Sequence, residues 1–255
     1  LGRLADGPVR DEARMEPLNL GVLAGLTPEG VDVRLWDDRI DEIDYDEPTD
    51  LVAITVEAFT ARRAYEIADE FRERGVPVIM GGVHATALPD EVAQHADSVF
   101  TGDAERCWTT VVADAHEGRL APRYDAPIAV PQPGTRPRRE LYAGKGYLPL
   151  ALLQYGRGCR FHCEYCAVGA YFDHRHHIRP VEEVVDEIRA QSGRNLFFVD
   201  DNIVADHEAA KRLFRALIPL RIRWVGQASV DQVRDPELMR LMVESGFLGN
   251  VIGFE

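Results

Sequence analysis

The sequence of 255 residues has no long hydrophobic run, no export signal and only four cysteines. Its longest apolar stretch, from Leu18 to Leu26, is far too short to cross a lipid bilayer. A basic start followed by an apolar run, which would mark a secreted protein, is also missing. We therefore expect a cytoplasmic protein without a membrane span, in which the cysteines stay reduced.

Basic residues are scarce relative to acidic ones. The chain has 29 Lys and Arg against 43 Asp and Glu, which gives a formal net charge of −14. A chain this acidic repels the phosphate backbone of nucleic acids, so a small-molecule substrate is the better expectation. Hydrophobic residues make up 45% of the sequence, which is typical of a globular protein and argues against disorder.

Residues 1–118 alternate apolar strands with helices, a pattern typical of a parallel α/β sheet. The expected strands are 31–35, 51–56, 76–80 and 98–101, and the expected helices are 18–26, 60–74, 89–96 and one that ends near Gly118. Ligands of such sheets bind beyond the carboxyl ends of the strands. The segments in that place are 57–60, 81–86 and 102–105. Their glycines allow either the close approach of a ligand or simply a tight turn.

Six prolines between residues 119 and 149 predict an extended connection between two domains. A second α/β series follows, with strands expected at 150–155, 195–199, 222–227 and 251–254 and helices at 180–190, 207–217 and 236–245. Three strand–helix units and a fourth strand look like the first half of a larger parallel barrel. Because the chain begins at Leu1 and ends within an apolar run, we expect a fragment of a longer protein.

Three of the four cysteines lie within eight residues, directly after an expected strand. Cys159, Cys163 and Cys166 have the spacing C-x3-C-x2-C. Three thiolates can bind three irons of a [4Fe–4S] cluster and leave the fourth iron open to a substrate or cofactor. Two alternatives are weaker: a structural zinc site needs His162 as its fourth ligand, and a disulfide would leave one cysteine over.

This motif, with Tyr165 before the third cysteine, resembles the signature of radical SAM enzymes. The resemblance implies that the three cysteines hold a [4Fe–4S] cluster whose open iron chelates S-adenosylmethionine. It implies that an electron, supplied by a reductase or a flavodoxin-type donor, then cleaves S-adenosylmethionine to a deoxyadenosyl radical. The candidate contacts to S-adenosylmethionine are Tyr165, Asp200, Asp201, Asn202, Gln227, Ser229 and Glu255. The Gly-Gly-Glu motif of the family is absent, and a helix cap with solvated charge is the alternative interpretation of the two aspartates.

The N-terminal half resembles the cobalamin-binding domain of cobalamin-dependent radical SAM enzymes, the hopanoid methylases among them. The segments that carry this resemblance are Pro17–Gly21, Leu26–Pro28, Arg62–Tyr65, Gly81–Thr86 and Gly102–Glu105. It implies a Rossmann-like (flavodoxin-like) domain in which three loops cradle the corrin. The candidate cobalamin contacts are Glu57, Ala58, Phe59, Thr60, Gly81, Gly82, Val83, His84, Thr86, Gly102, Asp103 and Glu105. The Asp-x-His-x-x-Gly motif of cobalamin mutases is absent, and we favour a loop role for His84 over cobalt ligation.

The resemblance implies an α/β chain in three parts. They are a Rossmann-like cobalamin domain at 1–118, whose first strand the sequence does not show, a linker at 119–149, and part of a radical SAM barrel at 150–255. The implied activity is C-methyl transfer to an unactivated carbon of a small molecule or lipid. A cobalamin-dependent oxidoreductase or cyclase is one alternative, and a non-catalytic iron–sulfur carrier or sensor is another.

Four further features carry weaker expectations. Cys107 is expected to be a buried apolar residue, and Arg138 and Arg139 are expected to pin the linker to the acidic domains. Arg179 is expected to contact either the cofactor or an acidic group. The run Asp173–His177 invites a metal interpretation, but we favour a solvated loop that touches substrate.

Overall fold

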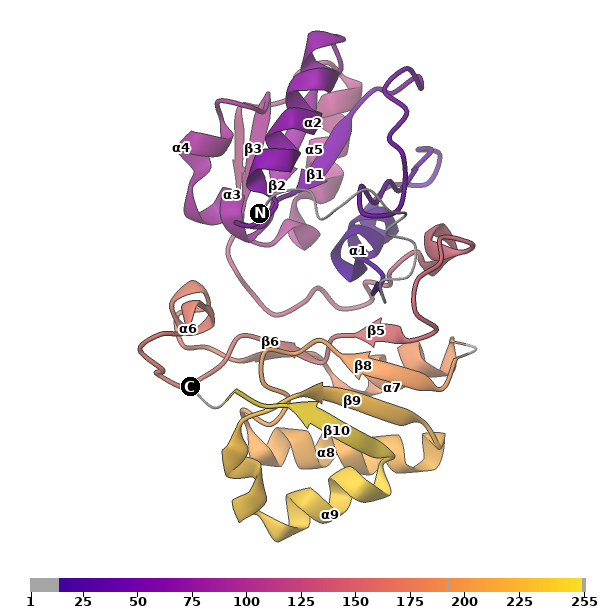
Figure 1. Cartoon of the computed structure of the whole chain (residues 1–255), viewed down its shortest axis with the longest axis vertical. Helices are drawn as coiled ribbons and strands as arrows, with labels where there is room; N and C mark the ends of the chain where they lie inside the picture. Colours follow the sequence, from indigo (N-terminus) through magenta and orange to yellow (C-terminus); the bar gives the residue numbers. More distant parts are fainter. Residues whose placement is uncertain (1–13, 192, 254–255) are drawn as a thin grey trace, which may run out of the picture. The chain divides into compact units, whose positions relative to one another are not determined.

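The computed structural model describes residues 14–191 and 193–253, which form two compact units that alternate along the chain (Figure 1). The N-terminal unit consists of Asn19–Arg34 and Ile43–Arg138. The C-terminal unit consists of the described parts of Leu1–Leu18, Leu35–Glu42 and Arg139–Glu255. No helix in the described ranges has the length and apolar character that a membrane span requires.

The N-terminal unit is built on a parallel sheet of four strands in the order β1-β2-β3-β4. The strands are β1 (Val52–Thr55), β2 (Val78–Gly81), β3 (Ser98–Thr101) and β4 (Arg123–Asp125). Its helices are α1 (Leu18–Leu26), α2 (Ala61–Glu73), α3 (Val83–Ala87), α4 (Pro89–Val92) and α5 (Trp108–His116), with a 3-10 turn, η1, at Ala104–Arg106. This Rossmann-like arrangement confirms the predicted α/β class.

Helices cover both faces of this sheet because its central strand is apolar on both sides. Alternate residues of a strand point to opposite faces. Val78 and Met80 pack in one buried cluster with Ile67 and Phe71 of α2. Ile79, between them, packs in a second cluster with Trp108 of α5, as expected for a strand buried on both faces.

The C-terminal unit contains a second parallel sheet, in the order β10-β9-β8-β5. Its strands are β5 (Ala151–Leu153), β8 (Asn195–Phe198), β9 (Arg223–Gln227) and β10 (Phe247–Val251). The helices that alternate with them are α7 (Val181–Arg189), α8 (His207–Leu217) and α9 (Pro236–Glu244). A ribbon of β6 (Gly156–Arg157) and β7 (His177–Ile178), the helix α6 (Ala167–Tyr171) and 3-10 turns at Arg139–Tyr142, Ile218–Leu220 and Val230–Arg234 complete the unit.

The three long helices of this unit pack on one face of the sheet (Figure 1). Trp224 of β9 is fully buried at the centre of the core, stacked on Phe214 of α8, and its indole N–H donates to Ser245 Oγ at 3.0 Å. Asp206 and Asp235 cap the amino ends of α8 and α9 by accepting from Ala209 N and Leu238 N, as N-cap residues do. Helices on one face of a parallel sheet are typical of a segment of a (β/α) barrel.

Three predicted elements differ from the structure. Residues 31–35 form no strand with any described segment. A fourth strand, β4, lies inside the stretch predicted to be an extended linker. The last strand is Phe247–Val251 rather than 251–254, because Gly246 ends the preceding helix with a positive φ of 92° and the chain extends directly afterwards.

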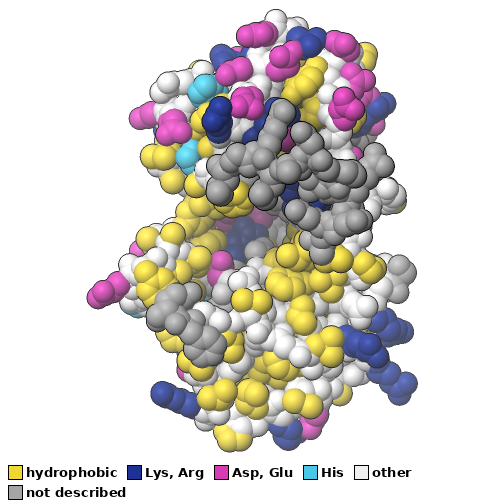
Figure 2. Space-filling view, in the orientation of Figure 1, with side chains coloured by type: hydrophobic (Ala, Val, Ile, Leu, Met, Phe, Trp, Pro, Cys, Tyr) yellow, Lys and Arg dark blue, Asp and Glu magenta, His cyan; other side chains and the backbone are white. Residues whose placement is uncertain are grey.

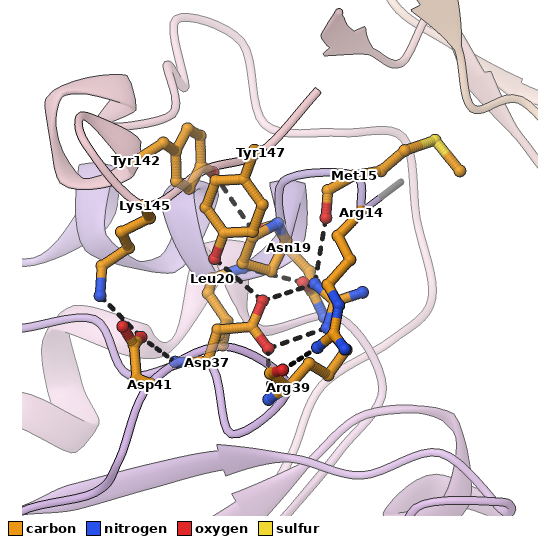
Figure 3. A network of polar contacts seen from close by, with 11 residues as sticks. Arg14, Met15, Asn19, Leu20, Asp37, Arg39, Asp41, Tyr142, Lys145 and Tyr147 are labelled. Carbon is orange, nitrogen blue, oxygen red and sulfur yellow. Dashed lines mark hydrogen bonds and ion pairs between the residues drawn. The ribbon is translucent and has the colours of Figure 1, made fainter. Parts of the chain in front are cut away.

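A polar network explains why the segment around residue 37 leaves the N-terminal unit (Figure 3). Asp37, 8% exposed, accepts from Arg39 Nε at 2.8 Å and from Tyr147 Oη at 2.9 Å. Burial raises the pKa of Asp37, but the bonds from Arg39 and Tyr147 leave it below its usual value. Lys145 Nζ reaches Asp41 at 2.6 Å. These contacts hold Leu35–Glu42 against residues of the C-terminal unit, so the alternating pattern of 31–35 is not used in a sheet.

Candidate functional site

The cysteine-bearing loop, Gly158–Cys166, lies between β6 and α6 and is called the cluster loop below. Cys163 is exposed, Cys159 and Cys166 are half-buried, and all three thiols are free of disulfides. Cys166 is the N-cap residue of α6, and its N–H donates to Cys163 O at 3.1 Å. The second and third cysteines are therefore joined in one backbone turn.

The loop depends on two glycines that precede or begin it. Gly158 has φ +80°, and a Cβ there would collide with the carbonyl of Arg175 and the ring of Phe172. A Cβ on Gly156 would lie 2.7 Å from Nε2 of His176. Glycine at both positions thus allows the backbone to pack closely against the segment that follows α6.

The histidine-rich run packs on the cluster loop. His174 Nδ1 lies 3.1 Å from Phe161 O, and its ring stacks on that of His162 with 3.8 Å between centroids. His176 and His177 are half-buried. The expectation of a solvated loop therefore holds only in part, because these rings support the backbone of the cluster loop.

Two successive aspartates after β8 hold the start of the cluster loop. Asp200 is fully buried, and its carboxylate accepts from Tyr155 N at 2.9 Å and Gly156 N at 2.6 Å. Asp201 Oδ2 accepts from Gly158 N at 2.7 Å. Burial raises the pKa of Asp200 to about 7, against the opposing effect of the two backbone N–H groups. In this structure both side chains bind protein backbone, so we assign them a positioning role.

Asn202 connects this region to a cysteine. Its Nδ2 donates to Cys159 Sγ at 3.7 Å and to Ser229 Oγ at 2.9 Å. Gln227, at the end of β9, donates to the carbonyl of Asp200 at 3.4 Å. Parallel neighbours β5, β8 and β9 end at the same edge, and the structure brings together Cys159, Asp200, Asp201, Asn202, Gln227 and Ser229 there. Tyr165 is 68% exposed, and Glu255 lies outside the described residues.

The donor set fits an iron–sulfur cluster. The described residues contain no group of three His, Cys, Asp or Glu side chains that converge on one metal ion. A [4Fe–4S] cluster does not need ligands that converge on one ion, because each thiolate binds a different iron. Three free thiols in one loop, one of them already accepting an N–H, supply that chemistry.

A buried charge network lies along the outer edge of β5, and sequence reasoning missed its acidic members, Glu16 and Glu187. Glu187 of α7 is 5% exposed and pairs with Arg139 at 2.9 Å and with Arg179 at 2.8 Å. Arg139 also donates to Leu152 O at 2.6 Å and pairs with Glu16, whose Oε1 accepts from Leu152 N at 3.0 Å. These side chains satisfy backbone groups that a further strand would otherwise bind. Arg139 thus pins the linker to acidic residues, and Arg179 contacts an acidic group, as expected.

The three segments proposed for cobalamin follow β1, β2 and β3 of the N-terminal unit. Phe59 is 89% exposed and Val83 is 45% exposed, so apolar surface is present at this edge. Gly82 has φ +103°, and a Cβ there would lie 2.9 Å from Val56 O. Thr86 Oγ1 accepts from Gly102 N at 2.9 Å and donates to Gly82 O at 2.9 Å. Thr86 therefore ties two of the segments together.

Several other candidate cobalamin contacts in these segments are hydrogen-bonded within the protein. His84 is buried, with Nε2 3.0 Å from Tyr65 Oη, which itself donates to Glu91 at 2.9 Å. Burial, together with Glu91, raises the pKa of Tyr65 to about 12. A ring engaged in this way agrees with the preference for a loop role of His84. Thr60 Oγ1 bonds to both backbone groups of Glu57, and Asp103 accepts from Ala129 N.

Comparison with known proteins gives one family match. Residues 153–254 match the model of the Radical SAM superfamily. The chain is 31% identical to the bacteriochlorophyllide d C-8(2)-methyltransferase of Chlorobaculum tepidum over 92% of this chain and 57% of the relative. It is 31% identical to the C-12(1)-methyltransferase of the same organism, over 94% and 55%.

A third relative is more distant. The hopanoid C-2 methylase of Rhodopseudomonas palustris is 24% identical over 97% of this chain and 50% of its own length. The chain therefore spans about half the length of the curated relatives it matches.

Proposed function

We propose that this chain, whose residues 153–254 match the model of the Radical SAM superfamily, acts in a cobalamin-dependent radical SAM enzyme that methylates carbon. The observation that carries the proposal is the cluster loop. Its first cysteine is hydrogen-bonded to Asn202, its first residue is held by Asp201, and the backbone just before it is held by Asp200. The three relatives are all named for methyl transfer. Their acceptors differ, so the proposed acceptor is an unactivated carbon of a small molecule or lipid, without a closer identity.

In this proposal the residues of the C-terminal unit bind and orient. Cys159, Cys163 and Cys166 would ligate three irons, while the strand-end residues Gln227 and Ser229 would face S-adenosylmethionine. Tyr165, with 68% of its surface exposed, would offer a ring to the adenine. The radical chemistry would come from the [4Fe–4S] cluster and S-adenosylmethionine, with the electron supplied by a reductase or flavodoxin-type donor.

The N-terminal unit would bind cobalamin, which would carry the methyl group. Gly82 and Gly102 both have positive φ, and because they lack a Cβ they would let the corrin approach the backbone at the end of the sheet. Phe59 and Val83 would supply apolar contact to the corrin face. His84, bonded to Tyr65, would act as part of the loop rather than as a cobalt ligand.

Cofactor content after anaerobic reconstitution tests this proposal. The chain would be incubated with iron, sulfide and hydroxocobalamin, desalted, and assayed for iron, sulfide and cobalamin per chain. We expect about four irons and one cobalamin. Cys159→Ala, Cys163→Ala and Cys166→Ala should each lose most of the iron, whereas the matched Cys107→Ala should keep it, because Cys107 lies in the N-terminal unit. Equal iron in all four variants would contradict the assignment.

A further inference from the structure

Asn202 has a buried side-chain amide that is hydrogen-bonded to the sulfur of one cysteine. It is 5% exposed and follows the two aspartates that hold the cluster loop. Its Nδ2 makes two hydrogen bonds, to Cys159 Sγ at 3.7 Å and to Ser229 Oγ at 2.9 Å. A buried amide with both N–H groups engaged by the protein has none left for S-adenosylmethionine.

The orientation of the amide is fixed by its oxygen. Oδ1 accepts from Val204 N at 3.2 Å and from Ser229 N at 3.2 Å. Two backbone N–H donors on one side require an acceptor there, so the amide nitrogen must face Cys159. An aspartate at this position would instead turn an oxygen toward the sulfur.

Cys159 differs from Cys163 and Cys166 in the hydrogen bonding of its sulfur. Among the described residues, Cys159 is the one cysteine of the cluster loop whose sulfur accepts a hydrogen bond from a side chain, and that side chain is buried. Cys163, by contrast, is exposed. A protein N–H to one thiolate makes the environment of the three ligands unequal.

We propose that Asn202, anchored by Ser229 and Val204, is a positioning residue that raises the reduction potential of the cluster through its N–H bond to Cys159. This inference rests on the proposed function, because it needs a cluster on the three cysteines. Reduction adds negative charge, part of which resides on the thiolate sulfurs, and an N–H donor stabilises that charge. Removal of the donor therefore makes the cluster harder to reduce.

An EPR-monitored redox titration of the reconstituted chain tests the inference. In Asn202→Asp, a nearly isosteric change, we expect the ratio of reduced to oxidised cluster at a fixed potential to fall about tenfold, a shift of about 59 mV for one electron. Ser229→Ala, which loosens the amide but keeps its donor, should shift the potential in the same direction by less. The control is Asn195→Asp, the same change at the exposed amino end of β8, which should leave the potential unchanged.

The possible outcomes separate the two proposals. A wild-type chain that takes up no cluster would contradict the proposed function, and this inference with it. A wild-type chain with a full cluster, and with the same potential as Asn202→Asp, would contradict the inference alone. If Asn202→Asp loses its cluster, Ser229→Ala decides, and an unshifted potential in that variant would overturn the role of the anchored amide.

Discussion

At the scale of single residues, the cluster loop depends on backbone shape as much as on its cysteines. There is no room for a Cβ at Gly156 or Gly158. Three backbone N–H groups of residues 155–158 donate hydrogen bonds to the carboxylates of Asp200 and Asp201. The loop is therefore shaped before any cofactor binds.

Gly158→Ala should destabilise the C-terminal unit and lower its iron uptake. The control Gly144→Ala has nearly the same φ, +77° against +80°, but open space around its Cβ. We expect Gly144→Ala to cost about 1 kcal/mol from backbone strain alone, and Gly158→Ala to cost more because the carbonyl of Arg175 must move. Urea unfolding of both variants measures the difference. Equal losses would show that the loop is not tightly packed there.

The cysteine motif could be identified from the sequence, whereas the contacts that hold the backbone beside it could not. The motif is local, so three cysteines and an aromatic residue within eight positions were enough to identify it. The bonds from Asp200 to Tyr155 and Gly156 span more than forty residues. They depend on β5 and β8 being neighbours, which no local pattern encodes. The closely spaced glycines before Cys159 were the one local signal of a strained loop.

At the scale of elements, buried strands and long amphipathic helices were predicted well, and short polar elements were not. α8, whose apolar residues recur at helical spacing, was predicted with its observed bounds. β4 has one inward side chain, Tyr124, between exposed Arg123 and Asp125, so it has no period to detect. Residues 31–35 have the alternating pattern of a strand, but the contacts of Asp37 with Arg39 and Tyr147 hold the following segment in the C-terminal unit.

The edge of β5 depends on the buried Glu187. Glu187→Gln would leave Arg139 and Arg179 without their shared carboxylate, and removing one partner of a buried pair costs about 3 to 5 kcal/mol. We expect a loss near the lower end of that range in urea unfolding. The control Glu182→Gln, exposed on the same helix, should change stability by less than about 0.5 kcal/mol. Similar losses in both variants would contradict the role given to the network.

The start of α9 should make stability depend on acid pH. Lys211 donates to Asp235 at 2.8 Å, and this bond, with the N–H of Leu238, lowers the pKa of Asp235 to about 2 from 3.8. A carboxylate whose pKa is lowered by folding stabilises the protein at pH values above its pKa in the unfolded state. This contribution is lost as the pH falls through its pKa in the folded state. Asp235→Ala should therefore unfold more easily than wild type at pH 7, with the gap narrowing between pH 4 and pH 2. The exposed Asp186→Ala is the control, and a gap independent of pH would contradict the ion pair.

At the scale of the whole molecule, the proposed function assigns one cofactor to each α/β unit, at the carboxyl ends of its parallel strands. Charged side chains of both signs cover much of the N-terminal unit in the space-filling view, and hydrophobic side chains are frequent on the face of the C-terminal unit seen there (Figure 2). Because the proposed sites lie in different units, we expect them to respond to substitutions independently.

Phe59→Asp should separate the two cofactors. The side chain is 89% exposed, so the change costs little stability, but it places a charge where the corrin is proposed to lie. We expect cobalamin retention to fall several-fold with iron content unchanged, and Phe59→Leu to retain cobalamin. If Phe59→Asp keeps its cobalamin, the first of the three proposed segments does not contact the corrin.

The most direct measurement of the central claim is EPR of the reduced cluster with and without S-adenosylmethionine. The account predicts a [4Fe–4S] signal that shifts when S-adenosylmethionine is added, because one iron has no protein thiolate, with cobalamin retained in the same sample. A cluster signal that ignores S-adenosylmethionine would contradict the account and favour an iron–sulfur carrier or sensor.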